Sequence, residues 1–398
     1  MITLSGRTSH AQLAKPLNRG VWLLADDQTS TTQRQARAYL VYDEREDQLP
    51  DYELYLTRNG RTLGGDRNFI QLPESFDYLH AGDVLRLSPK GERVHVVWRS
   101  DSLQNSILLT ERCDHYCLMC SQPPRDVDDD QLLEDAFELV RLLPPTTREI
   151  GFTGGEPTLY GDRLVKLLRL CRNLIPEAAV HVLSNGRRFS NPDFARAWAD
   201  IDNPNMMVGI PIYGAEPALH DYVVQSQGAF NTTVAGILNL AQLQQRIEIR
   251  VVVHKQTAPH LPEIAEFISR NLPFVDQVAL MGLEMIGFAR ANLAEVWIDP
   301  FDYQAELAEA VATLDRKGIT AMIYNHPLCL IPRELWPYAV RSISDWKNEY
   351  HPECLRCSVA HDCGGFFFSA KHRHSDHIQA IDPIDGDHHK LPLLSLAT

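Results

Sequence analysis

The sequence predicts an α/β protein with a central parallel sheet, preceded by a small β-rich domain and followed by a cysteine-rich segment. Three observations support this prediction. Short strand-like runs separated by turn residues fill the first hundred residues, strands alternate with helices from about residue 105, and four of the eight cysteines stand after residue 320. We therefore expect three segments, at 1–104, 105–300 and 301–398.

The composition is that of a globular protein and excludes several classes. Hydrophobic residues make up 44% and charged residues 23% of the chain, so it is not disordered throughout. The net charge of −14 argues against a nucleic-acid partner, which requires a basic surface. No uncharged apolar run is long enough to span a membrane, and residues 1–18 lack the apolar stretch of a signal peptide. We expect a soluble, cytoplasmic protein.

The first segment has the pattern of a small β-rich domain. Five short runs rich in apolar and aromatic residues are bounded by turn residues: 21–24, 38–42, 52–56, 82–87 and 94–98. The last two flank Lys90 and Gly91, which predicts a β-hairpin. Such a domain can recognise a peptide by adding it as a strand to a free sheet edge, or it can cover the neighbouring domain. The sequence leaves both roles open.

The second segment alternates strands with helices, which predicts a parallel sheet, either an open barrel or doubly wound. Strands are expected at 106–109, 149–153, 179–183, 206–212, 247–253 and 275–281, and helices at 128–143, 161–175, 192–199, 230–244 and 261–271. The helix at 128–143 is expected because three aspartates begin it, apolar residues recur at helical spacing, and Pro144 ends it. The third segment adds a helix at 303–317 and a strand at 319–324.

Three cysteines follow the first strand of this alternation in a C-x3-C-x2-C array: Cys113, Cys117 and Cys120. Thiolates are soft ligands that suit an iron–sulfur cluster or zinc. Three ligands would leave one iron of a [4Fe–4S] cluster without a protein ligand, so that a small molecule can bind there. A zinc site completed by His115 or by a distant cysteine is the alternative.

Two further motifs follow the next two strands. Gly154, Gly155 and Glu156 come after the strand at 149–153, and Ser184 and Asn185 end the strand at 179–183. Each motif is weak alone, but in this order the three resemble the radical S-adenosylmethionine (radical SAM) superfamily. The resemblance implies a partial (β/α)6 TIM-like barrel, with the active site at the carboxyl ends of its strands.

The resemblance also implies the chemistry. The open iron would bind the amino and carboxylate groups of S-adenosylmethionine (SAM), and one electron would cleave SAM to methionine and a 5′-deoxyadenosyl radical, which takes a hydrogen atom from the substrate. Met119 stands where the family commonly has an aromatic residue beside the adenine. The expected SAM contacts are Gly154, Gly155, Glu156, Ser184, Asn185 and Met119. No general acid or base is identified.

The cysteines near the end of the chain form a second group: Cys329, Cys354, Cys357 and Cys363. Their spacing resembles the auxiliary-cluster regions, of SPASM or twitch type, of peptide-modifying radical SAM enzymes. Four thiolates would hold a second [4Fe–4S] cluster, and a structural zinc knuckle is the alternative. The remaining Cys171 lies within a predicted helix, where it is expected to be buried.

Within the superfamily, residues 117–124, 209–214 and 220–225 resemble the His-Xaa-Ser system maturase family called HxsC. This resemblance implies post-translational modification of a ribosomally made peptide or protein with His-Xaa-Ser repeats. It also implies a second radical SAM maturase as partner, and an electron donor of flavodoxin or ferredoxin type. The net reaction would be of oxidoreductase type.

Two positions depart from the pattern of related radical SAM enzymes. Pro211 replaces a common serine, and 223–225 lack an arginine that holds the SAM carboxylate in many relatives. Recognition of the carboxylate must therefore come from elsewhere.

Two rival functions stay open. The first rival is radical SAM chemistry on another substrate: sulfatase-type Ser or Cys oxidation, tRNA or a small molecule. The second is a non-catalytic iron–sulfur or zinc scaffold protein.

Overall fold

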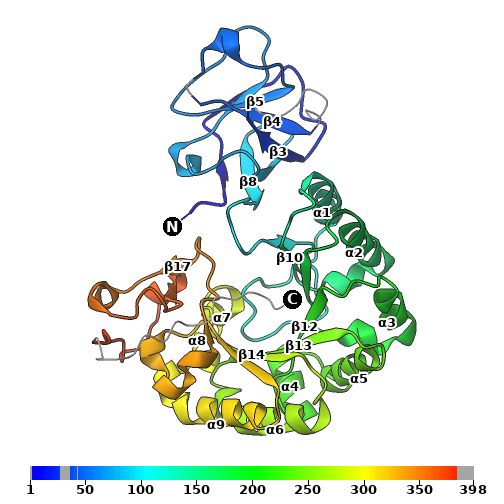
Figure 1. Cartoon of the computed structure of the whole chain (residues 1–398), viewed down its shortest axis with the longest axis vertical. Coiled ribbons are helices and arrows are strands. Elements are labelled where there is room, and N and C mark those ends of the chain that lie inside the picture. The colour runs from blue at the N-terminus through cyan, green and yellow to red at the C-terminus, as the bar shows by residue number, and fades with distance from the viewer. Residues whose placement is uncertain (1, 27–35, 43, 383–398) are drawn as a thin grey trace.

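The computed structural model describes residues 2–26, 36–42 and 44–382. The N-terminal domain lies at one end of the long axis of the molecule, and the α/β domain forms the rest together with the C-terminal segment (Figure 1). Residues 383–398 of the expected third segment lie outside the described residues.

The N-terminal domain is one eight-stranded sheet in the order β1-β8-β7-β3-β4-β5-β6-β2. The five predicted runs all form strands, and the hairpin at Gly91 joins β7 to β8 as an antiparallel pair. Three further strands of three residues each, β1, β2 and β6, were not predicted. The bounds are β1 Ser5–Arg7, β2 His10–Gln12, β3 Val21–Ala25, β4 Arg37–Leu40, β5 Leu54–Thr57, β6 Phe69–Gln71, β7 Val84–Leu87 and β8 Arg93–Trp98.

The two outermost strands of this sheet, β1 and β2, are halves of a single segment, residues 5–12. Its first half pairs with β8 and its second half with β6, so the segment joins the two ends of the sheet. One face of the sheet encloses a core that includes Trp22, Leu54 and Ile70. Both roles considered from the sequence, covering the neighbouring domain and recognising a peptide by strand addition, stay open.

The α/β domain contains an eight-stranded sheet in the order β16-β15-β14-β13-β12-β11-β10-β9, and every neighbouring pair is parallel. The six predicted strands are β9 to β14, in sequential order. The sheet then continues past residue 300 with β15 and β16. The expected boundary between the second and third segments at residue 300 stays a prediction. The bounds are β9 Ser106–Leu108, β10 Glu149–Thr153, β11 Ala179–Leu183, β12 Met206–Pro211, β13 Arg246–Val253, β14 Gln277–Gly282, β15 Thr320–Tyr324 and β16 Ala339–Val340.

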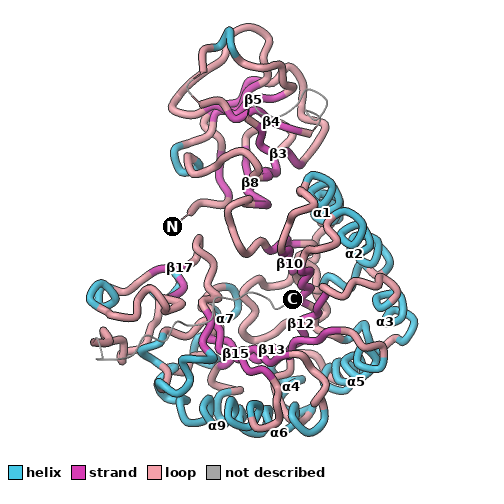
Figure 2. The backbone as a smooth tube through the Cα atoms, viewed as in Figure 1, coloured by secondary structure: helices cyan, strands magenta, loops and turns pink. Residues whose placement is uncertain are grey.

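Helices cover the outer face of the curved sheet, and the inner face of the sheet faces the centre of the domain (Figure 2). This is the partial barrel expected from the sequence. The helices are α1 Asp130–Leu142, α2 Asp162–Leu174, α3 Pro192–Ala199, α4 Pro217–Val224, α5 Ala229–Gln242, α6 Leu261–Asn271, α7 Gly287–Ala291, α8 Leu293–Val296 and α9 Gln304–Asp315. Among the described residues, no helix is long and apolar enough to cross a membrane.

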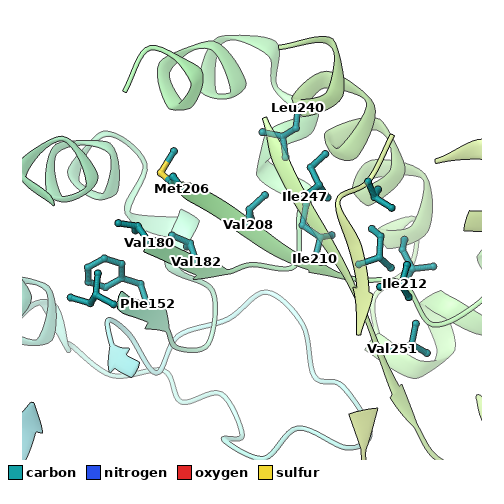
Figure 3. Packing of buried hydrophobic residues seen from close by; sticks show 14 of the residues in the cluster. Phe152, Val180, Val182, Met206, Val208, Ile210, Ile212, Leu240, Ile247 and Val251 are labelled. Atoms are coloured by element: carbon teal, nitrogen blue, oxygen red, sulfur yellow. The ribbon is translucent and has the colours of Figure 1, made fainter. Parts of the chain in front are cut away.

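Alternation along the strands separates the two faces of the sheet. Val180, Val208 and Ile247 are buried in the core beneath the helices (Figure 3). Burying side chains of this size stabilises the fold by about 1.5–3 kcal/mol each. On β13, Glu248 and Arg250 take the alternate positions and therefore face the inside of the barrel.

The C-terminal segment is built from short turns and one small antiparallel pair, β17 Asn348–Glu349 with β18 Phe366–Phe367. Two ion pairs attach it to the rest of the chain. Arg99, just after β8, lies 2.7 Å from Asp345, and Lys347 lies 2.9 Å from Glu284, just after β14. Arg99 is only 7% exposed, whereas the Asp345 side chain is 51% exposed, so only the arginine end of the first pair is shielded from water.

Candidate active site

The three-cysteine loop joins β9 to α1 at the carboxyl end of the sheet. Helices from later in the chain hold it on both sides: the Leu118 N–H donates to the Val223 carbonyl of α4 at 2.9 Å, and the Phe288 N–H of α7 donates to the Cys120 carbonyl at 2.8 Å. Elements far apart in the sequence thus fix the loop.

Asp129 anchors the start of the same loop. Its carboxylate accepts hydrogen bonds from the Thr110 hydroxyl at 2.8 Å and from the Glu111 N–H at 2.5 Å, and it lies 3.0 Å from the Arg112 guanidinium. Burial alone would raise the pKa of Asp129, but these hydrogen bonds and the charge of Arg112 lower it. The carboxylate is therefore ionised and holds the loop where it leaves β9.

The three thiols of the loop lie close enough to influence one another. Burial raises the pKa of all three and brings that of Cys113 to about 12, and mutual repulsion between thiolates adds to the shift at Cys113 and Cys117. The His115 backbone N–H donates a hydrogen bond to the Cys113 sulfur at 3.4 Å. Thiols in this environment become thiolates when a metal binds them.

The two glycines after β10 allow the chain to pack directly against this loop. A Cβ at Gly154 would lie 2.6 Å from the Thr110 carbonyl oxygen, and one at Gly155 would lie 2.2 Å from the Arg112 carbonyl oxygen. Two backbone hydrogen bonds hold the two segments together. The Gly155 N–H donates to the Thr110 carbonyl at 2.7 Å, and the Glu156 N–H donates to the Arg112 carbonyl at 2.8 Å. Only glycine leaves room for this contact.

Glu156 connects the ends of β10 and β11. Its buried carboxylate accepts hydrogen bonds from the Thr158 N–H at 2.9 Å, the Thr158 hydroxyl at 2.6 Å, the Ser184 hydroxyl at 2.9 Å and the Asn185 N–H at 2.6 Å. Burial raises the pKa of Glu156, and the four donors oppose that shift. The side chain therefore positions the loop of Ser184 and Asn185, two of the expected SAM contacts.

Two charged residues that sequence reasoning missed complete this surface. Asp114, between the first two cysteines, accepts a hydrogen bond from the Asn185 side chain at 2.6 Å and lies 3.3 Å from the Arg187 guanidinium. Both stand within two residues of a motif already singled out, but no spacing rule shows that they meet.

Met119 is buried rather than open to the inside of the barrel. It is 6% exposed and packs in an apolar cluster with Tyr213, Val223 and Val296. Its expected contact with the adenine stays a prediction.

The four C-terminal cysteines lie near enough to one another for their charges to interact. Burial, together with the charges of Cys363, Cys354 and Cys357, raises the pKa of Cys329 to about 11. Backbone N–H groups point at the sulfurs: those of Leu328 and Gly365 lie 3.4 Å from Cys363. Such donors are typical of iron–sulfur sites, where they tune the cluster. Cys171 is fully buried in α2, as expected.

The spacing of the cysteine sulfurs bears on whether a site holds a single zinc ion or an iron–sulfur cluster. Sulfurs bound to one zinc ion lie about 3.8 Å apart, given Zn–S bonds of roughly 2.3 Å at tetrahedral angles. Among the described residues, only His80, Asp83 and Asp101 form a group of three or more His, Cys, Asp or Glu side chains whose ligand atoms all lie within 4.8 Å of one another. No three cysteine sulfurs of the described residues are that close. Each group offers three or more thiols, and thiolates are the ligands that hold iron–sulfur clusters.

Comparison with known families matches this geometry. Residues 107–268 match the family model of the radical SAM superfamily. This segment is a radical SAM domain. It contains the three-cysteine loop and both motifs at the following strand ends, but not the C-terminal cysteines. A search of curated proteins gave no match.

Several solved structures are similar to this chain. Streptococcus suis SuiB bound to S-adenosylmethionine is similar over 71% of this chain and 76% of its own, with 12% identity and a TM-score of 0.50. Another SuiB structure matches over 57% of this chain with 15% identity and a TM-score of 0.44, and this chain spans about half (50%) of its length. Native anSMEcpe with bound AdoMet matches over 55% of this chain and 62% of its own, with 17% identity and a TM-score of 0.43.

Proposed function

We propose that this protein is a radical SAM enzyme that cleaves SAM reductively and modifies a ribosomally made peptide or protein. One observation carries the proposal: the three-cysteine loop lies at the carboxyl end of a parallel partial barrel, with the two glycines and Glu156 of the next strand packed against it. Active sites of parallel α/β barrels lie at this end of the strands.

The residues present fit a [4Fe–4S] cluster and SAM. Cys113, Cys117 and Cys120 would hold the cluster through their thiolates, which are the ligands that iron–sulfur clusters take. When bound, the cluster and SAM supply a 5′-deoxyadenosyl radical by one-electron reduction of the sulfonium. The chain itself shapes the SAM site: Gly154 and Gly155 let the end of β10 pack against the three-cysteine loop, and Glu156 fixes the loop of Ser184 and Asn185 beside it.

A peptide or protein substrate has two supports. The residues around the first cluster resemble the HxsC family, whose partner carries His-Xaa-Ser repeats. SuiB, whose SAM-bound form shares this fold, has also been solved with its precursor peptide SuiA. We extend the proposal to a substrate with His-Xaa-Ser repeats, a second radical SAM maturase as partner, and an electron donor of flavodoxin or ferredoxin type.

The second cysteine group gives the substrate radical a route to a stable product. A cluster held by Cys329, Cys354, Cys357 and Cys363 would accept one electron from that radical as it loses a proton, which makes the net reaction an oxidation at His or Ser, such as a crosslink or a dehydrogenation. Anchoring the substrate is the alternative role for this cluster.

Replacing these four cysteines with alanine is expected to separate the two steps. Release of 5′-deoxyadenosine should continue because the first cluster is intact, whereas modified peptide should disappear because the electron has no acceptor. Iron content should fall by about four per chain. Full product formation by this variant would contradict the electron-accepting role.

The test of the proposed function is release of 5′-deoxyadenosine by the anaerobically reconstituted protein, given SAM and a strong reductant. The same assay is repeated with a synthetic peptide that carries His-Xaa-Ser repeats, and the peptide mass is followed. We expect release in both assays and a mass change in the peptide. No release in either, by protein with about eight irons bound, would contradict the proposal and favour a scaffold protein.

A further inference from the structure

We compare four arginines from the three-cysteine loop, from β13 and from the end of β11, and three of them have a carboxylate within 3.1 Å. These pairs are Arg112 with Asp130, Arg125 with Glu111, and Arg250 with the buried Glu248. The fourth, Arg187, follows the Ser184 and Asn185 motif at the end of β11. Of the four, it has the longest distance to its nearest carboxylate, 3.3 Å from Asp114.

The contacts of Arg187 show this. Its Nε donates to the Thr232 hydroxyl at 3.2 Å, and its Nη1 donates to the Ser226 hydroxyl at 3.1 Å. Nη1 also lies 3.3 Å from the Asp114 carboxylate, longer than the roughly 2.7–2.9 Å of a charge-assisted hydrogen bond. Nη2 has no hydrogen-bond partner among the described residues, and the side chain is 27% exposed.

The position of this guanidinium fits a ligand at the open iron. Asp114, its neighbour, directly follows Cys113, and Asn185 joins the same group through its 2.6 Å hydrogen bond to Asp114. Residues 223–225, which end α4 beside the loop, carry no cation. A planar guanidinium with a free N–H edge binds a carboxylate through two parallel hydrogen bonds.

We propose that Arg187 binds the methionine carboxylate of SAM. The proposal rests on the proposed function, because it requires SAM at the three-cysteine loop. On binding, Nη2 donates to one carboxylate oxygen, and Nη1 turns from its long contact with Asp114 to the other. Thr232 and Ser226 keep the guanidinium in place.

The test is the affinity of the cluster-loaded protein for SAM, measured by anaerobic equilibrium dialysis without reductant, so that no turnover occurs. Arg187→Gln is expected to weaken binding roughly 10- to 100-fold, the range for hydrogen bonds to charged groups. Arg187→Lys should recover part of this loss, because it keeps the charge but not the fork. Arg188→Gln is the matched control: Arg188 is exposed and lies 5.3 Å from the Phe194 ring, away from Asp114.

Two further measurements separate ligand binding from a merely structural role. Decarboxylated SAM should bind the wild type and Arg187→Gln equally, because the group that Arg187 recognises is gone. Asp114→Asn should keep or tighten SAM binding, since it releases the guanidinium. If Arg187 served only to hold the loop through Asp114, both variants would lose iron and SAM together.

The outcomes are distinct. Wild-type affinity for SAM in Arg187→Gln, or the same loss for decarboxylated SAM as for SAM, would overturn the assignment of Arg187 and leave the proposed function standing. Failure of the cluster-loaded wild type to bind SAM would overturn the proposed function itself.

Discussion

Replacing Cys117 with alanine is expected to abolish release of 5′-deoxyadenosine. Cys117 is the middle of the three thiols, and burial and the charges of the neighbouring Cys120 and Cys113 raise its pKa. Two remaining thiolates do not hold a [4Fe–4S] cluster with one open iron, so about four irons per chain should be lost. Iron analysis, the electron paramagnetic resonance spectrum of the reduced protein and chromatography of the nucleoside product measure the three effects.

The matched control is Cys171→Ala. Cys171 is also a buried cysteine of the radical SAM domain, but it lies within α2 and packs in the main core. Its replacement should leave the iron content and nucleoside release unchanged, at a cost to stability of about 1 kcal/mol for the lost apolar group. Retention of all iron by Cys117→Ala, or an equal loss in Cys171→Ala, would contradict the assignment of the first cluster.

Replacing Gly155 with alanine is expected to disturb the same loop from the opposite side. The added methyl group would lie 2.2 Å from the Arg112 carbonyl oxygen and 3.0 Å from Cys113 Cβ, so either the loop or β10 must move. Because the obstacle is backbone, the cost is at the upper end for overpacking, roughly 3 kcal/mol. Urea unfolding of the iron-free protein measures that cost, and iron content after reconstitution shows whether the loop still holds a cluster.

Gly318→Ala controls for the general cost of replacing a glycine. Gly318 has a φ of +71° and open space around it, so an alanine there meets only the backbone penalty of about 1 kcal/mol. Iron content should not change. If Gly155→Ala were no more destabilising than Gly318→Ala and kept its iron, close packing against the loop would not be the reason for glycine at 155.

Most of the sheet could be predicted because its signals are local. The six strands β9 to β14 each carry a run of apolar residues, and α3 and α6 begin and end at the predicted residues. The strands β1, β2 and β6 span three residues each, too few to show alternation. Only pairing defines them: β1 with β8, β2 with β6, and β6 with β5.

The sequence predicts the candidate ligands but not the contacts that hold them in place. Cysteine spacing shows which thiols act together, because all three in the first group share one loop. The pairing of Asp114 with Arg187 joins residues 73 positions apart, and Asn292 reaches the Leu118 carbonyl from 174 positions away. Such contacts depend on how the barrel closes, which no local pattern encodes.

The ion pairs of Arg99 with Asp345 and of Lys347 with Glu284 have a thermodynamic consequence. They tie the segment between β16 and β17 both to the end of the N-terminal domain and to the rim of the barrel. A metal centre that binds the folded C-terminal cysteines stabilises that fold by mass action, and the tied neighbours share the gain. The iron supply of the cell would in this way influence how cooperatively all three parts of the chain unfold, and not only whether the enzyme is active.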